Sequence, residues 1–261
     1  MRNSDISTAL SYLNPISLEA ITEVMLMNRV ETKFLFSAGK LAELIYLLDN
    51  RYKVLEINNL RVLPYQTTYM DTTDHLFYNQ HVRGQLERNK IRYRKYMSTS
   101  ETFLEIKRKT NTGRTIKLRI ENDPDAGFFD DPAINFLHEN ISVDLTIVKP
   151  KIINRFTRTT LIGLESKERI TLDFNISFSE PDNVRNVLMP YLAIAELKME
   201  QYSYCSPFNN LIKYLKIRSS SFSKYCTGIA ILDESLKRNM IKSKTLMLDR
   251  IENEYIGSQL A

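Results

Sequence analysis

Hydrophobic and charged positions alternate along several short segments of the chain. In "TFLEIKRKT", residues 102–110, Leu104 and Ile106 alternate with Glu105, Lys107 and Lys109. Neighbouring side chains of a β-strand point to opposite faces of the sheet, so this period of two predicts a strand with one apolar and one charged face. Strands are predicted at 29–36, 65–71, 88–97, 102–109, 114–121, 151–163, 168–175 and 192–201. "TNTGR", between the fourth and fifth of these, predicts a hairpin.

Two segments follow the helical period instead. Residues 38–49 come after Ser37, and residues 207–217 begin with Pro207 after Ser206. Serine is a good N-cap and proline suits the first helical position, so both segments are expected to form amphipathic helices. Shorter helices are predicted at 16–25, 73–81, 132–140 and 182–190, with Asp71 and Thr72 capping the second.

These elements predict an α+β fold in one domain, residues 1–261. Its core covers about residues 25–230, with a peripheral N-terminal helix and a peripheral C-terminal tail after about residue 240. About eight antiparallel strands are enough to close a barrel, and the amphipathic helices can cover the apolar outer face. The charged faces would then line a cationic tunnel.

The signs of the charges support a tunnel that binds an anion. Six strands, counting Arg29 and Glu200 at their ends, carry eleven Lys or Arg and five carboxylates on their charged faces, and the whole chain has a net charge of +5. Like charges on adjacent strands destabilise a sheet, so this excess requires a compensating anion. A linear polyphosphate fits a narrow bore better than a duplex does, and arginine binds phosphate in a bidentate manner. No nucleic acid is expected.

The carboxylates on these faces have two interpretations. Glu105 and Glu196 can neutralise Lys107 and Lys198, two residues further along the same face. Alternatively, Glu31, Glu196 and Glu200 can bind Mg²⁺ or Mn²⁺, which proteins hold through few carboxylates and phosphate oxygens.

Other features indicate a cytoplasmic protein without a transmembrane segment. The N-terminus does not resemble a signal peptide, and no run of apolar residues is long enough to span a bilayer. Only two cysteines occur, Cys205 and Cys226, which fits a reducing compartment. His75, His81 and His138 lie outside the charged strands and are expected to have structural or surface roles.

Nine segments together resemble a known family. They are "NRVETKF", "YMDTTDHLFYNQH", "NKIRYRKY", "FLEIKRK", "GRTIKLR", "NRFTR", "RITLDF", "AIAELKM" and "FSKYCTGI", in this order. They resemble the VTC domain, the catalytic domain of vacuolar transporter chaperone polyphosphate polymerases, in the triphosphate tunnel metalloenzyme superfamily. The resemblance implies a tunnel in which the terminal phosphoryl group of ATP is transferred to a polyphosphate chain, with a divalent metal as cofactor.

The resemblance also implies roles for individual residues. The phosphate-binding set would be Lys33, Arg92, Arg94, Lys107, Lys117, Arg155, Arg169, Lys198 and Lys224. Lys33, Arg92, Arg94, Lys107 and Lys198 of this set would be catalytic. Glu196 would bind the metal, with Glu31 as a second ligand.

Two departures from the superfamily bear on the activity. Its metal-dependent triphosphate hydrolases begin with E-x-E-x-K, whereas this chain has Arg29, Glu31 and Lys33, which favours the polymerase and weakens Glu31 as a ligand. The SPX domain and membrane segments of the eukaryotic subunits are not found, so export would need a separate membrane partner protein. A tripolyphosphatase or nucleoside triphosphatase, and a non-catalytic binder of polyphosphate or nucleotide, remain alternatives.

Overall fold

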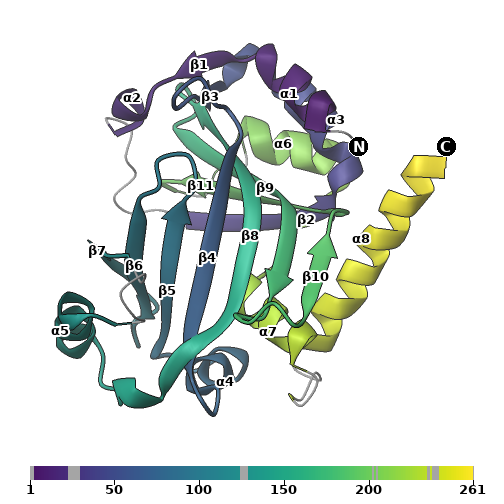
Figure 1. Cartoon of the computed structure of the whole chain (residues 1–261). Coiled ribbons are helices and arrows are strands. Elements are labelled where there is room, and N and C mark those ends of the chain that lie inside the picture. Colours follow the sequence, from purple (N-terminus) through teal and green to yellow (C-terminus); the bar gives the residue numbers. More distant parts are fainter. Residues whose placement is uncertain are drawn as a thin grey trace.

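One curved antiparallel sheet forms the centre of the molecule (Figure 1). The computed structural model describes residues 3–22, 30–123, 129–201, 203, 205–233, 236 and 241–260. The strand order is β2 (Val30–Ser37), β11 (Leu192–Met199), β9 (Glu168–Ser179), β8 (Val148–Gly163), β4 (Leu63–Thr72), β5 (Arg88–Tyr96), β6 (Thr102–Lys109) and β7 (Thr115–Glu121). Three short strands flank this path: β1 (Asn14–Ile16), β3 (Lys53–Leu55) and β10 (Asn186–Met189).

The sheet curls into a barrel with an open seam, because β2 and β7 stand at opposite ends of the strand order. Inner side chains nevertheless reach across: Lys107 Nζ on β6 lies 3.9 Å from Glu31 Oε2 on β2. At the outer edge of β2, Ser219 forms a β-bridge with Phe34, and the Ser220 amide donates to the Lys33 carbonyl at 2.8 Å. The predicted antiparallel barrel with flanking helices is therefore confirmed, although its closure is incomplete.

Helices cover the outer face of the barrel on two sides. Around β2, β11 and β9, α1 (Asn3–Ser11), α3 (Leu41–Leu48) and α6 (Pro207–Tyr214) bury apolar side chains such as Phe36 and Leu197 in one core cluster. Against β5 and β6, α5 (Asp131–Asn140) buries Leu137 in a second cluster. A short helix, α2 (Leu18–Thr22), and 3-10 turns at Ala38–Lys40, Asp49–Arg51 and Leu145–Ile147 complete these layers.

A further helix, α7 (Lys224–Leu232), packs against the inner face of the barrel at one end. The Tyr225 and Tyr69 rings lie 5.1 Å apart between centroids. A Cβ on Gly228 would lie 2.2 Å from Ile152 Cδ1 and 2.5 Å from a Phe178 ring carbon, so the glycine allows the helix to approach β8 and β9 closely. This end of the barrel is therefore filled with apolar side chains.

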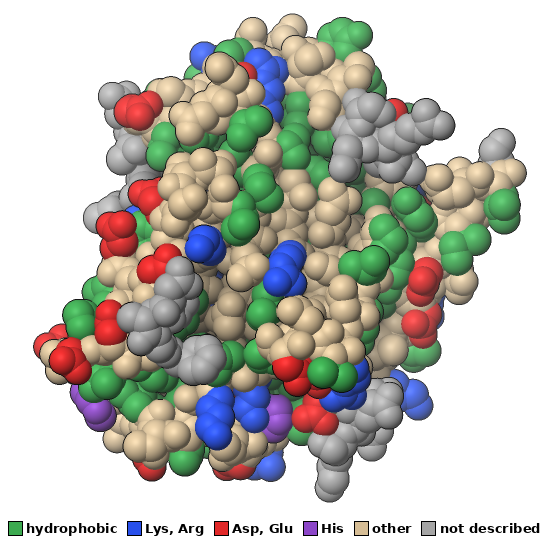
Figure 2. Space-filling view, viewed as in Figure 1, with side chains coloured by type: hydrophobic (Ala, Val, Ile, Leu, Met, Phe, Trp, Pro, Cys, Tyr) green, Lys and Arg blue, Asp and Glu red, His purple; other side chains and the backbone are tan. Residues whose placement is uncertain are grey.

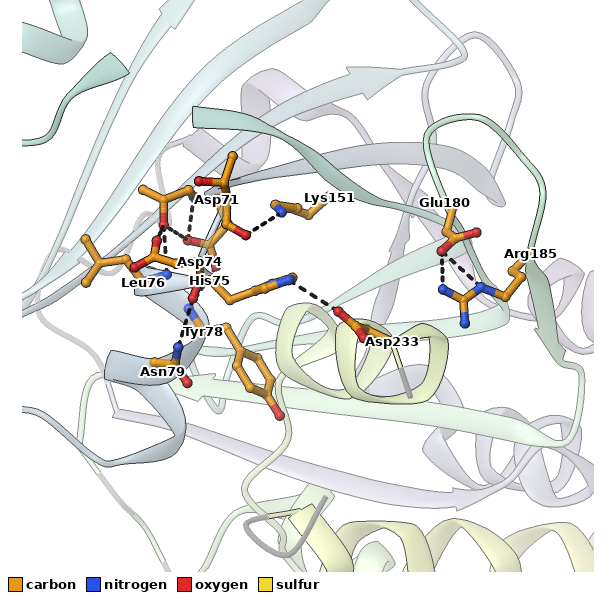
Figure 3. A network of polar contacts seen from close by, with 12 residues as sticks. Asp71, Asp74, His75, Leu76, Tyr78, Asn79, Lys151, Glu180, Arg185 and Asp233 are labelled. Carbon is orange, nitrogen blue, oxygen red and sulfur yellow. Dashed lines mark hydrogen bonds and ion pairs between the residues drawn. The ribbon is translucent and has the colours of Figure 1, made fainter. Parts of the chain in front are cut away.

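A buried carboxylate, Asp71, joins α7 to α4 (Leu76–Val82) at the same end. Figure 3 shows Asp71 beside the start of α4. Asp71 accepts hydrogen bonds from the Phe77 and Tyr78 amides at 2.9 and 3.0 Å, and from the Tyr225 hydroxyl. Thr72 Oγ1 accepts from the Leu76 amide at 2.9 Å. The predicted capping role of Asp71 and Thr72 is thus confirmed.

Two regions differ from the sequence prediction. The helix predicted at 182–190 is wrong: residues 186–189 form β10, which pairs with residues 176–179 of β9 because the ladder outweighs a weak helical pattern. The C-terminal tail forms a long helix, α8 (Lys242–Leu260), that packs onto the body through the buried Leu248 and Ile251. Of the helices described, none has the length and apolarity needed to cross a membrane.

Candidate functional site: a cationic chamber inside the barrel

Charged side chains of neighbouring strands face one another inside the barrel. On one wall, Lys33 of β2 stands opposite Glu196 of β11, and Glu31 stands opposite Lys198. On the other wall, β5, β6 and β7 align in the rows Lys90, Lys107 and Lys117, and Arg92, Glu105 and Arg119. Residues opposite one another across a ladder share a face, so these rows form one lining. We call this lining, with Asp173, Arg158 and Lys224 described below, the chamber.

The first wall is built around Glu196. Its carboxylate lies 2.8 Å from Lys33 Nζ and 2.7 Å from Lys198 Nζ. Burial raises the pKa of Glu196, but the two lysines more than offset this and hold its pKa well below the usual range. Glu31 Oε2 lies farther away, 4.0 Å from Lys33 Nζ. Glu196 is therefore a carboxylate shared by two cations.

The second wall contains a similar group around Glu105, which is almost completely buried. Arg92 lies 2.6 Å from Glu105 Oε2, and Lys117 binds the other oxygen. Burial raises the pKa of Glu105, yet Arg92, Arg94 and Lys117 bring it down to about 2. Beside this group, the buried Arg94 Nε has no hydrogen-bond partner in the described part of the chain. Burial and the neighbouring Arg92 lower the pKa of Arg94, so this guanidinium is incompletely compensated.

The third group links the barrel to α7. Arg158 of β8 donates two hydrogen bonds to Asp173 of β9 at 2.6 and 2.8 Å, and Lys224 of α7 binds the same carboxylate. Burial raises the pKa of Asp173, but the two cations bring it to about 2. Burial also lowers the pKa of Lys224 to about 8. Because Ser223 caps α7 by accepting from the Cys226 amide, the helix start fixes Lys224 at the chamber.

The structure brings together most of the residues that the sequence singled out. Around the chamber lie Lys33, Arg92, Arg94, Lys107, Lys117, Arg169, Lys198 and Lys224, with Glu31 and Glu196. Arg169 of β9 is included because it stands opposite Lys198 of β11, so its side chain lies on the same inner face. Glu200 lies after the end of β11 and is exposed, and Arg29 falls outside the described residues.

Arg155 is not brought into the chamber. It is exposed, and it donates to Gln66 Oε1 at 3.0 Å and Ser179 Oγ at 3.2 Å on the outer side of the sheet. Over the strands at the front of Figure 2, Lys and Arg side chains are few and scattered. The outer face of this part of the sheet is therefore not a cationic surface.

Sequence reasoning missed Arg158, three residues beyond Arg155. An odd separation places two residues of a regular strand on opposite faces, so only one of the pair can face inward. A register shift between Arg155 and Thr157 in the β8–β9 ladder also breaks the simple period there. The cross-strand position of Arg158, opposite Asp173, is the signal that identifies it, and it becomes visible only when the register is known.

Glu196 and Glu31 are the chamber carboxylates that could bind a metal ion taking most of its ligands from phosphate and water. At Glu196 such an ion would share the carboxylate with Lys33 and Lys198. No group of three or more His, Cys, Asp or Glu suited to a metal occurs among the residues that the structure describes. Glu196 is ionised and supplies hard oxygen atoms, with Glu31 on the neighbouring strand. Mg²⁺ and Mn²⁺ sites of phosphate-handling proteins use few carboxylates in this manner.

A cavity of about 650 Å³ opens beside the chamber. Glu31 and Lys33 of the chamber line one side of it. The remaining lining includes His81 at the end of α4, Arg88 of β5, residues 219–223 and Lys244 of α8. The chamber is thus connected to the surface through the region near the seam.

Comparison with solved structures shows that other proteins share the fold of this barrel. A proposed adenylate cyclase from Bacillus halodurans is 15% identical and has a TM-score of 0.51, with 76% of this chain and 94% of that chain covered. A proposed adenylyl cyclase from Hippeastrum, described as having a dominant triphosphatase activity, is 13% identical and has a TM-score of 0.52, covering 78% and 96%.

The sequence comparison identifies the family. A family model, the VTC domain, matches residues 28–233, so the chain belongs to the VTC domain family. No curated protein matches the chain.

Proposed function

We propose that this protein is a metal-dependent polyphosphate polymerase, a phosphotransferase that moves the terminal phosphoryl group of ATP onto a polyphosphate chain inside the barrel. The observation that carries the proposal is the chamber, where cations from eight different elements face one another inside the barrel. Membership of the VTC domain family supports the same activity.

The chamber residues supply what phosphoryl transfer requires of a protein. The reaction needs in-line positioning of the phosphates and stabilisation of the charge on the transferred group, with little covalent help. Arg92 and Arg94, side by side on β5, can hold equatorial phosphate oxygens, while Lys33 and Lys198 can neutralise charge from the opposite wall. A divalent ion bound at Glu196, with Glu31, would neutralise phosphate oxygens when present.

The paired carboxylates prepare the site for an anion. Without phosphate, Glu196, Glu105 and Asp173 hold the lysines and arginines in place and limit their repulsion. A phosphate chain can take over part of this compensation without rearranging the backbone. Preorganised cations of this kind stabilise developing charge at low reorganisation cost.

Hydrolysis of a triphosphate is the second candidate function. The activity described for the Hippeastrum protein, which shares the fold, favours it. Against it stands Arg29, at the position where metal-dependent hydrolases of the superfamily have a glutamate. A water molecule would then replace the polyphosphate chain as the acceptor.

The discriminating experiment is product analysis with ATP labelled in the terminal phosphate. Purified protein is incubated with Mn²⁺ or Mg²⁺ and a short polyphosphate primer. Label in longer chains together with ADP supports the polymerase, whereas label only in orthophosphate supports the hydrolase. Salt-dependent binding without turnover would leave a non-catalytic polyphosphate or nucleotide binder and refute both enzymes.

A further inference from the structure

The opening near the seam continues the positive charge of the chamber toward the surface. Arg88 and Lys109 stand opposite each other on β5 and β6, one inner-face position beyond Lys90 and Lys107. Arg88 lines the cavity, and Lys90 Nζ contacts Ser223 Oγ, another lining residue, at 3.2 Å. The row of cations on these strands therefore does not end at the chamber.

The opposite side of this opening comes from a different part of the chain. Residues 219–223 contribute serine hydroxyls, and Lys244 of α8 places its Nζ 3.1 Å from Ser220 Oγ. The segment is held in position by the hydrogen bond from the Ser220 amide to β2. Cations and hydroxyl donors from separate elements thus converge on one cavity.

The electrostatics of His81 report the same excess of positive charge. Burial, and after it the cations Lys90, Arg88, Lys109 and Lys107, together lower the pKa of His81 to about 3. Burial likewise lowers the pKa of Lys90 to about 8. An imidazole that stays neutral adds no further repulsion to the opening.

We infer that this opening is a second phosphate-binding site, which holds the stretch of a linear polyphosphate chain that lies outside the chamber. Arg88 and Lys244 would contact its phosphates from opposite sides, with the serine hydroxyls as additional donors. The identity of the anion rests on the proposed function, but the site itself is defined by the cavity and its lining residues.

Polyphosphate fits this lining better than single-stranded RNA. Binders of single-stranded nucleic acid interleave cations with aromatic platforms on which successive bases stack. Here Phe222 and the His81 imidazole are the aromatic rings of the described lining, and they do not form a row between the cations. Apart from Glu31, the other lining residues are cations, hydroxyls and small apolar side chains. A chain of phosphates without bases needs only the cations and hydroxyls.

The test compares the affinities of this chain for long-chain polyphosphate and for tripolyphosphate. Both are measured by calorimetry at one fixed salt concentration without ATP. The double variant Arg88→Ala/Lys244→Ala should lower the ratio of long-chain to tripolyphosphate affinity by about tenfold, because two phosphate contacts outside the chamber are lost. It should also reduce the salt dependence of long-chain binding. The matched control is Arg155→Ala/Lys95→Ala, which should leave the ratio unchanged. Arg155 and Lys95 both stand opposite Gln66 of β4, so they lie on the outer face together.

An unchanged ratio in the double variant would overturn the inference, as would an equal loss of affinity for both ligands, which would place the two residues in the chamber's own binding. Competition by an RNA of equal phosphate number as strong as that by polyphosphate would overturn the assigned ligand. The outcome is separable from that of the proposed function. If the double variant lowers the affinity ratio but the wild-type protein shows no turnover, the polymerase alone is refuted. If the wild-type protein elongates polyphosphate but the double variant leaves the affinity ratio unchanged, the second site alone is refuted.

Discussion

The two halves of the barrel interior differ in how they are filled. At one end, α7 packs Tyr225 and Ile229 against apolar side chains of β8 and β9, and the Asp71 network ties α7 to α4. In the other half, β8 and β9 present Arg158 and Asp173 to the chamber, and β5 and β6 present Arg92 and Glu105. The apolar half supplies burial that stabilises the fold, whereas the charged half contains ions whose desolvation is costly.

This difference shows how one barrel can be both stable and prepared for an anion. Each carboxylate of the chamber is shared between two cations, which limits the repulsion without neutralising the site. Lys224 connects the halves, because it begins the apolar helix and ends at Asp173. A substitution in the charged half should therefore change anion affinity and the free energy of unfolding in opposite directions. A substitution in the apolar half should change the free energy of unfolding without this opposite change in affinity.

The largest effect on stability is expected from Asp173→Asn. The substitution keeps the shape of the side chain but leaves Arg158 and Lys224 buried without their carboxylate. Losing one partner of a buried ion group costs about 3–5 kcal/mol, so the free energy of unfolding in urea should fall by about that amount. Saturating tripolyphosphate should reduce the difference in unfolding free energy between the variant and the wild-type protein, because the phosphates pair with the two cations. Unchanged stability without ligand would show that Asp173 does not compensate the two cations.

Arg94→Ala should have the opposite signature. The buried Arg94 Nε has no partner among the described residues, so removing the guanidinium relieves repulsion from Arg92. We expect unchanged or slightly higher stability, but a loss of about 10²-fold in phosphoryl transfer or tripolyphosphate affinity. The matched control is Arg155→Ala, because Arg155 lies exposed on the outer face. Equal losses in the two variants would place the phosphate path elsewhere.

Gly228→Ala tests the apolar half. The added methyl group would meet Ile152 and Phe178 at distances shorter than van der Waals contact, so α7 or these side chains must shift. Overpacking of this kind costs about 1–3 kcal/mol, measurable as a lower urea midpoint. Gly228→Ala leaves no ion unpaired. The difference in unfolding free energy between this variant and the wild type should therefore be the same with and without tripolyphosphate, unlike the difference for Asp173→Asn. Restoration by tripolyphosphate would contradict the division of the interior into two halves.

Much of this organisation could be predicted from the sequence, because alternation in the strands fixes which residues share a face. The chamber residues on β2, β5, β6, β7, β9 and β11 follow directly from the period of two. The position of α7 could not be predicted, since a mostly apolar segment such as 224–232 lacks the one-sided pattern that identifies an amphipathic helix.

Arg158 marks the other limit of sequence reasoning. Arg155 and Arg158 lie three residues apart on β8, and the register of this strand shifts between them. The alternation of side chains along the sequence therefore does not decide which arginine faces inward. The identity of its partner, Asp173, depends on a ladder between strands. Such pairings arise from tertiary structure rather than from the local pattern.

The smallest expected effect is the pH dependence that Lys224 gives to the free energy of unfolding and to the affinity for tripolyphosphate. Burial lowers the pKa of Lys224 from 10.5 to about 8, so between about pH 8 and 10.5 the unfolded chain binds more protons than the folded one. The free energy of unfolding should therefore receive a contribution from Lys224 that rises with pH across this window. Affinity for tripolyphosphate should fall over the same window, because the deprotonated amine no longer attracts phosphate. Urea unfolding and calorimetry at pH 7, 8 and 9 measure both trends, and subtracting the profile of Lys224→Met isolates this residue. If the differences between the wild type and Lys224→Met in unfolding free energy and in tripolyphosphate affinity do not change with pH, Lys224 is not the residue that links the charged half of the interior to phosphate.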